Sequence, residues 1–202
     1  MQRQNIILDL DETLIHTWDK CDDIRKLNTN KYLPIRHRMF KIDSMDYIGS
    51  FREHAEKFLD YCFKRFNYVI IWTAGTEDYA AEINNVLFKF LNNTPDLTLD
   101  KNHIKMYNDN SYSKPITKIA KKFPELKNGL FLENTFIVDN MIQNFKENPH
   151  NGIQIPPYEV KNLDDILYLE DNALKTLMKW FELEKTKRSL DIRKLDKSKI
   201  FD

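Results

Sequence analysis

Three short apolar runs occur along this chain, and each of them gives way at once to polar side chains. The runs are "NIIL" at residues 5–8, "YVIIW" at 68–72 and "TFIV" at 135–138. A short apolar run with polar ends is typical of a strand buried in a parallel sheet. Amphipathic helical patterns lie at residues 53–66, 76–91 and 163–187. Strands that alternate with helices predict an α/β fold with a central, mainly parallel sheet flanked by helices.

The polar residues that end these runs carry functional groups. They are Asp9, Asp11 and Thr13 after the first run, Thr73 after the second, and Asp139 with Asn140 after the third. Side chains at two-residue steps share one face while a chain stays extended, so we expect Asp9, Asp11 and Thr13 to lie together. Ligands of such folds bind beyond the carboxyl ends of the strands. Because isolated buried carboxylates are costly, a metal, a partner or a substrate is expected at this edge.

Composition narrows the class of protein. The 202 residues suit one domain, and the hydrophobic share of 42% is that of a globular chain. Lys plus Arg and Asp plus Glu number 31 each, so no overall charge favours direct binding to nucleic acid or to a membrane surface. No membrane-spanning apolar run and no signal peptide is evident, and we expect a soluble intracellular protein of the nucleus or cytoplasm. Cys21 and Cys62 have no metal or redox spacing, and Cys62 is expected to be a buried reduced thiol.

The pattern along the chain predicts one domain over residues 1–190. Residues 17–50 are polar and irregular, with strand-like pieces at "RHRMFKI" and "DYIGSF", and they are expected to form a small β insertion. A strand is expected at "HIKMY" and a short helix after Lys114, with Pro115 in its first turn. Residues 191–202 are charged and are expected to form a less ordered tail.

Taken singly, the candidate residues have ordinary interpretations. A lone Asp-x-Asp-x-Thr is a weak signal, because Asp and Thr commonly cap helices and turns. Thr73 alone would end a strand, Lys114 alone would be a surface charge, and the Asp139-Asn140 pair alone would form a turn. Their order along the chain, at the ends of successive elements, favours a joint site.

Four segments carry a resemblance to a known family. They are "ILDLDETLIH", "VIIWTAGTEDYA", "SYSKPITKI" and "FIVDNMIQNFKENPHNGIQIPPY". In this order they resemble the motifs of the haloacid dehalogenase superfamily and, within it, the small carboxy-terminal-domain phosphatases (FCP/SCP-like, also called NLI-interacting-factor-like). The resemblance covers about residues 5–185. It implies a Rossmann-like fold with the β insertion between motifs one and two. Arg52 precedes Glu53 where the family usually has Arg-Pro, so a contribution of Arg52 to substrate binding stays open.

The resemblance also implies catalytic and metal-binding roles. Asp9 would be the nucleophile that forms an aspartyl-phosphate, and Asp11 the general acid and base. Mg²⁺ would bind the Asp9 carboxylate, the Asp11 backbone carbonyl and the Asn140 side chain, which are the oxygen ligands that this ion prefers. Asp9 thus belongs to both sets.

The remaining motif residues would bind or brace. By the same resemblance, Thr73 and Lys114 would bind the phosphate, Asp139 would orient Lys114, and Thr13 would brace the loop. Trp18, Trp72 and the segment "MFKIDSMDYIGSF" would line a groove for a peptide or pack in the core; the residues alone leave both open.

The resemblance implies a Mg²⁺-dependent phosphoprotein phosphatase for phosphoserine or phosphothreonine, with the repeat tail of RNA polymerase II as the expected substrate. A phosphorylated protein or peptide is therefore the expected partner. Two alternatives remain. One is a phosphatase of another phosphoprotein, of small molecules or of nucleic-acid ends, since the same motifs serve many substrates. The other is a binding module that keeps the fold without catalysis.

Overall fold

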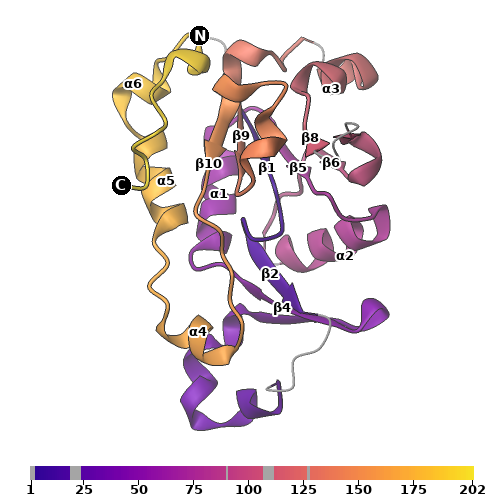
Figure 1. Cartoon of the computed structure of the whole chain (residues 1–202), viewed down its shortest axis with the longest axis vertical. Coiled ribbons are helices and arrows are strands. Elements are labelled where there is room, and N and C mark those ends of the chain that lie inside the picture. The colour runs from indigo at the N-terminus through magenta and orange to yellow at the C-terminus, as the bar shows by residue number, and fades with distance from the viewer. Residues whose placement is uncertain (1–2, 19–23, 90, 107–111, 127) are drawn as a thin grey trace.

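The computed structural model describes residues 3–18, 24–89, 91–106, 112–126 and 128–202 (Figure 1). Cys21 lies outside the described residues. The centre of the fold is a five-stranded sheet in the order β10-β9-β1-β5-β6, and every neighbouring pair is parallel. Its strands are β1 (Asn5–Leu8), β5 (Val69–Trp72), β6 (Leu97–Leu99), β9 (Thr135–Asp139) and β10 (Gly152–Gln154). The predicted parallel sheet is confirmed, and β6 and β10 are strands that the pattern did not predict.

Helices cover both faces of this sheet because the strand side chains alternate. Ile6 and Leu8 point into the larger core with α1 (Ala55–Arg65), α2 (Glu77–Leu87) and α5 (Ala173–Phe181). Ile7 points into a second core on the opposite face, with α3 (Ile116–Lys122). The sheet is therefore buried on both sides, as its near-continuous apolar strands require.

Three expected elements differ from the structure. The long helical pattern at 163–187 is three helices, α4 (Leu163–Tyr168), α5 and α6 (Glu184–Lys187). The strand expected at "HIKMY" is only β7 (Lys105–Met106), which pairs antiparallel with β8 (Tyr112–Ser113), while Tyr107 lies outside the described residues. Pro115 caps α3 instead of lying within its first turn.

The short 3-10 helices are η1 (Ile24–Asn28), η2 (Asn30–Arg38), η3 (Asp43–Met45), η4 (Lys101–His103), η5 (Pro124–Leu126), η6 (Leu132–Asn134), η7 (Ile142–Phe145), η8 (Pro149–Asn151) and η9 (Ile192–Lys194).

The insertion between the first two motifs is a small antiparallel sheet, as expected. It has the order β2-β4-β3, from β2 (Ile15–Trp18), β3 (Met39–Ile42) and β4 (Tyr47–Phe51). A third apolar cluster joins Tyr32 and Ile35 of η2 to Tyr158 and Leu163 near α4. The insertion therefore packs against a segment from the far end of the sequence, at the lower end of the molecule in Figure 1.

The charged segment 191–202 packs against the body of the protein. Ile192 and Ile200 are buried in the larger core, and Lys197 Nζ donates to the carbonyl of Ile192 at 2.7 Å. This segment is ordered by apolar contacts that its high charge conceals in the sequence. Where the domain ends stays a prediction.

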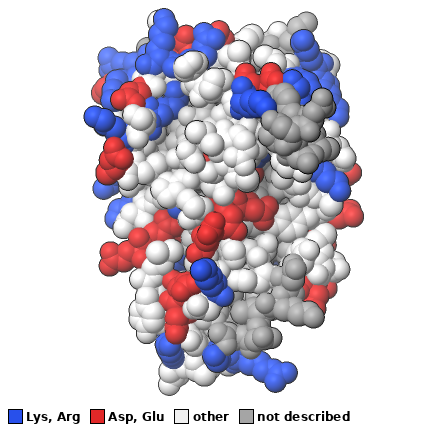
Figure 2. All heavy atoms as spheres, viewed as in Figure 1, with Lys and Arg blue, Asp and Glu red and all other residues white. Residues whose placement is uncertain are grey.

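Cys62 is a free, buried thiol, as the pattern predicted. Within the described residues, none of the helices has the length and apolar character needed to cross a membrane. On the face shown in Figure 2, acidic atoms gather across the middle and basic atoms lie mainly towards the two ends. That face carries mixed charge rather than the single-sign field that attracts nucleic acid.

Candidate active site

The carboxyl ends of the central strands bring the motif residues to one edge of the sheet. Leu8 of β1 is in register with Ile71 of β5 and with Val138 of β9. The Asp9 amide donates to the Val138 carbonyl at 3.0 Å, which places Asp9 beside Asp139. The parallel register therefore assembles residues that are more than a hundred positions apart in the sequence.

Lys114 joins two of the carboxylates. Its Nζ lies 2.6 Å from Asp9 Oδ1 and 2.6 Å from Asp139 Oδ2, and its side chain is 0% exposed. The Lys114 amide donates to the Asn144 carbonyl at 2.9 Å, so the backbone of η7 holds the lysine in place. Lys114 is thus part of a buried ionic cluster and is no surface charge.

Asp139 is held by groups that follow it in the chain. Its Oδ1 accepts the Met141 amide at 2.8 Å, and its Oδ2 accepts Asn144 Nδ2 at 2.8 Å in addition to Lys114. A carboxylate with three donors has a defined orientation, and it directs Lys114 toward Asp9. Asn144 was not singled out from the sequence. Its only signal there is its place in "DNMIQN".

Thr13 reaches Asp9 through a turn, and the expectation of a continuous extended strand was wrong. β1 ends at Leu8, and Glu12 has a left-handed backbone with φ of 58°. The Leu14 amide donates back to the Leu10 carbonyl at 2.8 Å, which closes the turn. Thr13 Oγ1 then donates to Asp9 Oδ2 at 3.1 Å. Both Asp9 oxygens therefore have a donor, one from Thr13 and one from Lys114.

Asp11 turns away from Lys114 and towards α2. Its Oδ2 accepts the Thr73 hydroxyl at 3.3 Å, and its Oδ1 accepts the Tyr79 hydroxyl. Thr76 caps α2 through the Tyr79 amide at 3.2 Å, and this places Tyr79 in the first turn. Tyr79 was not singled out from the sequence. Its spacing three residues after the cap is the only sign that it lies at the start of the helix.

Gly75 leaves room for this arrangement. A Cβ atom added at Gly75 would lie 2.4 Å from Cδ1 of the Tyr79 ring, a distance that no side chain could accept. The Gly75 amide also donates to Thr73 Oγ1 at 3.0 Å. Gly75 therefore contacts the Thr73 hydroxyl and leaves space for the Tyr79 ring, the two groups that donate to Asp11.

Burial raises the pKa values of both aspartates of the first motif. Burial raises the pKa of Asp9 to about 7, although Lys114 opposes the rise. Burial also raises the pKa of Asp11, which favours its protonated form. Burial alone lowers the pKa of Lys114, but Asp9 and Asp139 raise it above its usual value and keep the ammonium charged.

The oxygen atoms at this edge fit a hard divalent cation. Asp9, Asp11 and Asp139 bring three carboxyl groups, and Lys114 pairs with those of Asp9 and Asp139. Asn140 directly follows β9, and its side-chain amide makes no hydrogen bond to a described residue. The carboxyl oxygens and the uncommitted amide oxygen are the kind of ligands that suit Mg²⁺. The described residues include no group of three or more His, Cys, Asp or Glu able to hold a metal, so an amide or carbonyl would have to complete the set.

A cavity of about 600 Å³ opens beside Asp11. The insertion forms one wall and α2 the other, and the lining residues are Asp11, Thr17, Met45, Tyr47, Gly75, Thr76 and Tyr79. Tyr47 belongs to the aromatic segment that the sequence marked for a groove or for the core. Trp72 is 0% exposed and packs in the second core, whereas Trp18 packs against the third apolar cluster, the one that contains Tyr32 and Tyr158.

The chain matches the model of a protein family and is similar in sequence to viral proteins. A family model described as NLI interacting factor-like phosphatase matches residues 4–193. The chain is 30% identical over 165 residues to the putative CTD phosphatase-like protein 355R of Invertebrate iridescent virus 3, a match that covers 78% of this chain and 85% of the relative. Its counterpart in Invertebrate iridescent virus 6 is 33% identical over 164 residues, covering 77% of this chain and 86% of the relative.

Two solved structures share the fold. One is the fission yeast RNA polymerase II CTD phosphatase Fcp1 bound to beryllium fluoride, with a TM-score of 0.58, 21% identity, and coverage of 89% of this chain and 50% of that one. The other is Fcp1, described as an essential RNA polymerase II CTD phosphatase, with a TM-score of 0.58, 20% identity, and coverage of 92% of this chain and 52% of that one. The chain therefore spans about half the length of these two proteins, and at such low identity the likeness shows the fold alone.

Proposed function

Because this chain belongs to the NLI interacting factor-like phosphatase family, we propose that it removes phosphate from phosphoserine or phosphothreonine in a protein, with Asp9 as the nucleophile. The observation that carries the proposal is the buried contact set in which Lys114 joins Asp9 to Asp139. A carboxylate held beside a cation at the carboxyl edge of a parallel sheet is well placed to attack a phosphorus atom.

In the first step, an oxygen of the Asp9 carboxylate attacks phosphorus and forms an aspartyl-phosphate. The bond from phosphorus to the serine or threonine oxygen breaks, and that oxygen takes its proton from the Asp11 carboxyl. The raised pKa of Asp11, caused by burial, supports this role because it favours the protonated form before the step. Thr13 and Lys114 keep the Asp9 carboxylate in one orientation during the attack.

In the second step, water replaces Asp9 on phosphorus. The Asp11 carboxylate, which lost its proton in the first step, accepts one from the water molecule as the water oxygen attacks. The bond between Asp9 and phosphorus breaks, and the products are inorganic phosphate and the original Asp9 carboxylate. Asp11 is protonated again and ready for another cycle.

Mg²⁺ would be held by the Asp9 carboxylate, the Asp11 carbonyl and the Asn140 side chain. When bound, it supplies positive charge between the carboxylate and the phosphate oxygens. Lys114 has three N–H groups, and two of them face Asp9 and Asp139, so the third can donate to the phosphate. The single hydroxyl proton of Thr73 points to Asp11, so this hydroxyl has to turn before it can donate to the phosphate.

The substrate we propose is the phosphorylated repeat tail of RNA polymerase II. The viral relatives carry the description CTD phosphatase-like, which is the basis for this choice. The cavity beside Asp11 supports a peptide substrate, because Met45, Tyr47 and Tyr79 give it an apolar and aromatic lining next to the proposed acid.

The test begins with hydrolysis of p-nitrophenyl phosphate with Mg²⁺ and after its removal with EDTA. We expect the rate to fall at least about 100-fold without the metal, because several kcal/mol of charge stabilisation are lost, and to return when Mg²⁺ is restored. Mg²⁺ is also expected to raise the Tm of the wild type more than that of Asn140→Ala, since a ligand of the folded state stabilises it. Singly phosphorylated polymerase-tail peptides are expected to be hydrolysed faster than unrelated phosphopeptides.

Different failures point to different errors. Full activity in EDTA would contradict the Mg²⁺ proposal. Equal, slow rates on every peptide would contradict the polymerase tail as the substrate and leave the phosphatase mechanism standing. An equal effect of Mg²⁺ on the Tm of both proteins would remove Asn140 from the ligand set.

Removal of the Tyr79 hydroxyl is expected to slow catalysis. In Tyr79→Phe, Asp11 loses a donor that fixes its orientation, and we expect kcat to fall about tenfold, a part of the 10²–10⁴ that a positioned acid or base contributes. The KM for p-nitrophenyl phosphate should change little. Tyr61→Phe is the matched control. Tyr61 lies on α1, and its hydroxyl also donates to a carboxylate, that of Glu182 at the end of α5, in an exposed position. Equal kcat values for the two variants would show that Tyr79 does not position the acid.

A further inference from the structure

Arg52 lies where the insertion returns to the main domain, between β4 and α1. Its amide donates to the Leu14 carbonyl at 2.9 Å, and its side chain is 2% exposed. A buried arginine requires partners for its charge, because an unpaired guanidinium inside a protein is strongly unfavourable. The role of Arg52 can therefore be inferred from the groups that accept hydrogen bonds from its guanidinium.

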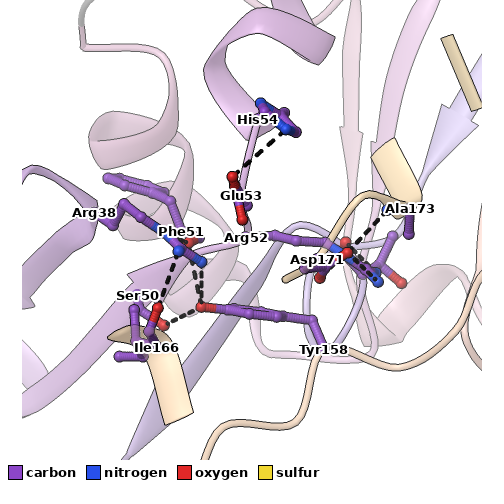
Figure 3. Close-up of polar contacts among 11 residues, drawn as sticks. Arg38, Ser50, Phe51, Arg52, Glu53, His54, Tyr158, Ile166, Asp171 and Ala173 are labelled. Carbon is purple, nitrogen blue, oxygen red and sulfur yellow. Dashed lines mark hydrogen bonds and ion pairs between the residues drawn. The ribbon is translucent and has the colours of Figure 1, made fainter. Parts of the chain in front are cut away.

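Asp171 supplies the charge partner. Arg52 Nε donates to Asp171 Oδ2 at 2.7 Å, and Nη2 donates to Asp171 Oδ1 at 3.3 Å. Figure 3 shows the two side chains side by side, with the Tyr158 ring next to them. The Tyr158 ring centroid lies 5.8 Å from Arg52 Cζ. The two-pronged contact fixes the guanidinium plane as well as its charge.

Asp171 itself is anchored by α5. Its Oδ1 accepts the Ala173 amide at 2.9 Å at the start of that helix, and its side chain is 7% exposed. Leu174 and Leu177 of α5 are fully buried in the larger core. The position of Asp171, and through it that of Arg52, is therefore set by the C-terminal part of the fold.

The remaining arm of Arg52 reaches the loop of the first motif. Nη1 donates to the Thr13 carbonyl at 3.2 Å. Thr13 in turn donates through Oγ1 to Asp9 Oδ2 at 3.1 Å. A continuous series of hydrogen bonds thus runs from Asp171 through Arg52 and Thr13 to Asp9.

We propose that Arg52, held by Asp171, is a positioning residue that fixes the Thr13 peptide so that the Thr13 hydroxyl orients the Asp9 carboxylate. This inference rests on the proposed role of Asp9. It answers the question that the sequence left open, because Nε, Nη1 and Nη2 all donate within the protein and the side chain is almost fully buried. Arg52 therefore acts on the reaction through Thr13 and does not bind the substrate phosphate.

The test compares Arg52→Lys with the wild type. Lysine keeps the charge for Asp171 but cannot also reach the Thr13 carbonyl in the same geometry. We expect kcat for p-nitrophenyl phosphate to fall about 10- to 100-fold, the cost of a small misplacement of a reacting group. The KM and the inhibition constant of inorganic phosphate should stay within about twofold, because no phosphate contact is lost. Asp171→Asn should lower kcat in the same way by a smaller factor, and it tests the same link if Arg52→Lys does not fold.

Arg38→Lys is the matched control. Arg38 also donates to the backbone, at the Phe51 carbonyl, and to the Tyr158 hydroxyl, but it makes no hydrogen bond to the loop of residues 9–13 (Figure 3). Rates are normalised to the folded fraction, measured by circular dichroism at the assay temperature. Arg38→Lys should then have the kcat of the wild type.

Two results would overturn the inference. A kcat for Arg52→Lys equal to that of Arg38→Lys after normalisation would make the role of Arg52 one of stability alone. An increase in KM and in the phosphate inhibition constant at unchanged kcat would make Arg52 a substrate ligand. A wild type without phosphatase activity, or an Asp9→Asn variant with full activity, would instead refute the proposed function, and the inference would fall with it.

Discussion

The Asp9→Asn variant is expected to hydrolyse p-nitrophenyl phosphate roughly 10⁴-fold or more slowly than the wild type, because an amide cannot replace the attacking carboxylate. Asparagine has nearly the same size and keeps an oxygen for the Thr13 hydroxyl, while Lys114 keeps Asp139 as a partner. We therefore expect a folded protein that has lost the chemical step. The measurements are the rate in the presence of Mg²⁺ and the amount of phosphate that stays bound to the protein after an acid quench.

Asp60→Asn provides the control for this change. Asp60 lies on α1, where it pairs with Lys64 at the surface and outside the buried cluster. Its activity should equal that of the wild type. Activity of Asp9→Asn comparable to that of Asp60→Asn would exclude an aspartyl-phosphate at Asp9 and would favour direct attack by water.

Lys114→Met is expected to have the second large effect, on stability as well as on rate. Methionine fills a similar volume but leaves the Asp9 and Asp139 carboxylates without the cation that lies 2.6 Å from each. Removal of one partner from a buried ionic cluster costs about 3–5 kcal/mol of unfolding free energy. We expect this loss in urea unfolding at neutral pH in EDTA, together with a loss of about 10²- to 10³-fold in kcat as a phosphate donor disappears.

Two further variants make this result interpretable. Lys64→Met removes a lysine whose partner Asp60 is at the surface, and its unfolding free energy should change by less than about 0.5 kcal/mol. Lys114→Met combined with Asp9→Asn and Asp139→Asn removes the repulsion and should regain part of the lost stability. If Lys114→Met were as stable as Lys64→Met, the cluster would not depend on its cation.

The sequence alone predicts well which strands are buried. The strands β1, β5 and β9 are four or five residues long and each contains three or four consecutive apolar residues, and polar residues at their ends lie at the carboxyl edge of the sheet. Strands β6 and β10 have only three residues each, too few for a periodic pattern to be recognised. The long helical pattern at 163–187 is divided where Asp171 accepts the Ala173 amide and pairs with Arg52. That division depends on a partner 119 positions away, which no local pattern contains.

Four sequence motifs thus determined the fold class, the family resemblance and the set of residues that meet at the edge of the sheet, because apolar runs and their polar ends are local properties of the chain. Only the tertiary structure decided the contacts among those residues. The left-handed turn at Glu12 brings Thr13 to Asp9, and the start of α2 brings Tyr79 to Asp11. Packing of α5 brings Asp171 to Arg52. The physical reason is that a buried polar group must find its partner wherever the packed chain places one, often far away in the sequence.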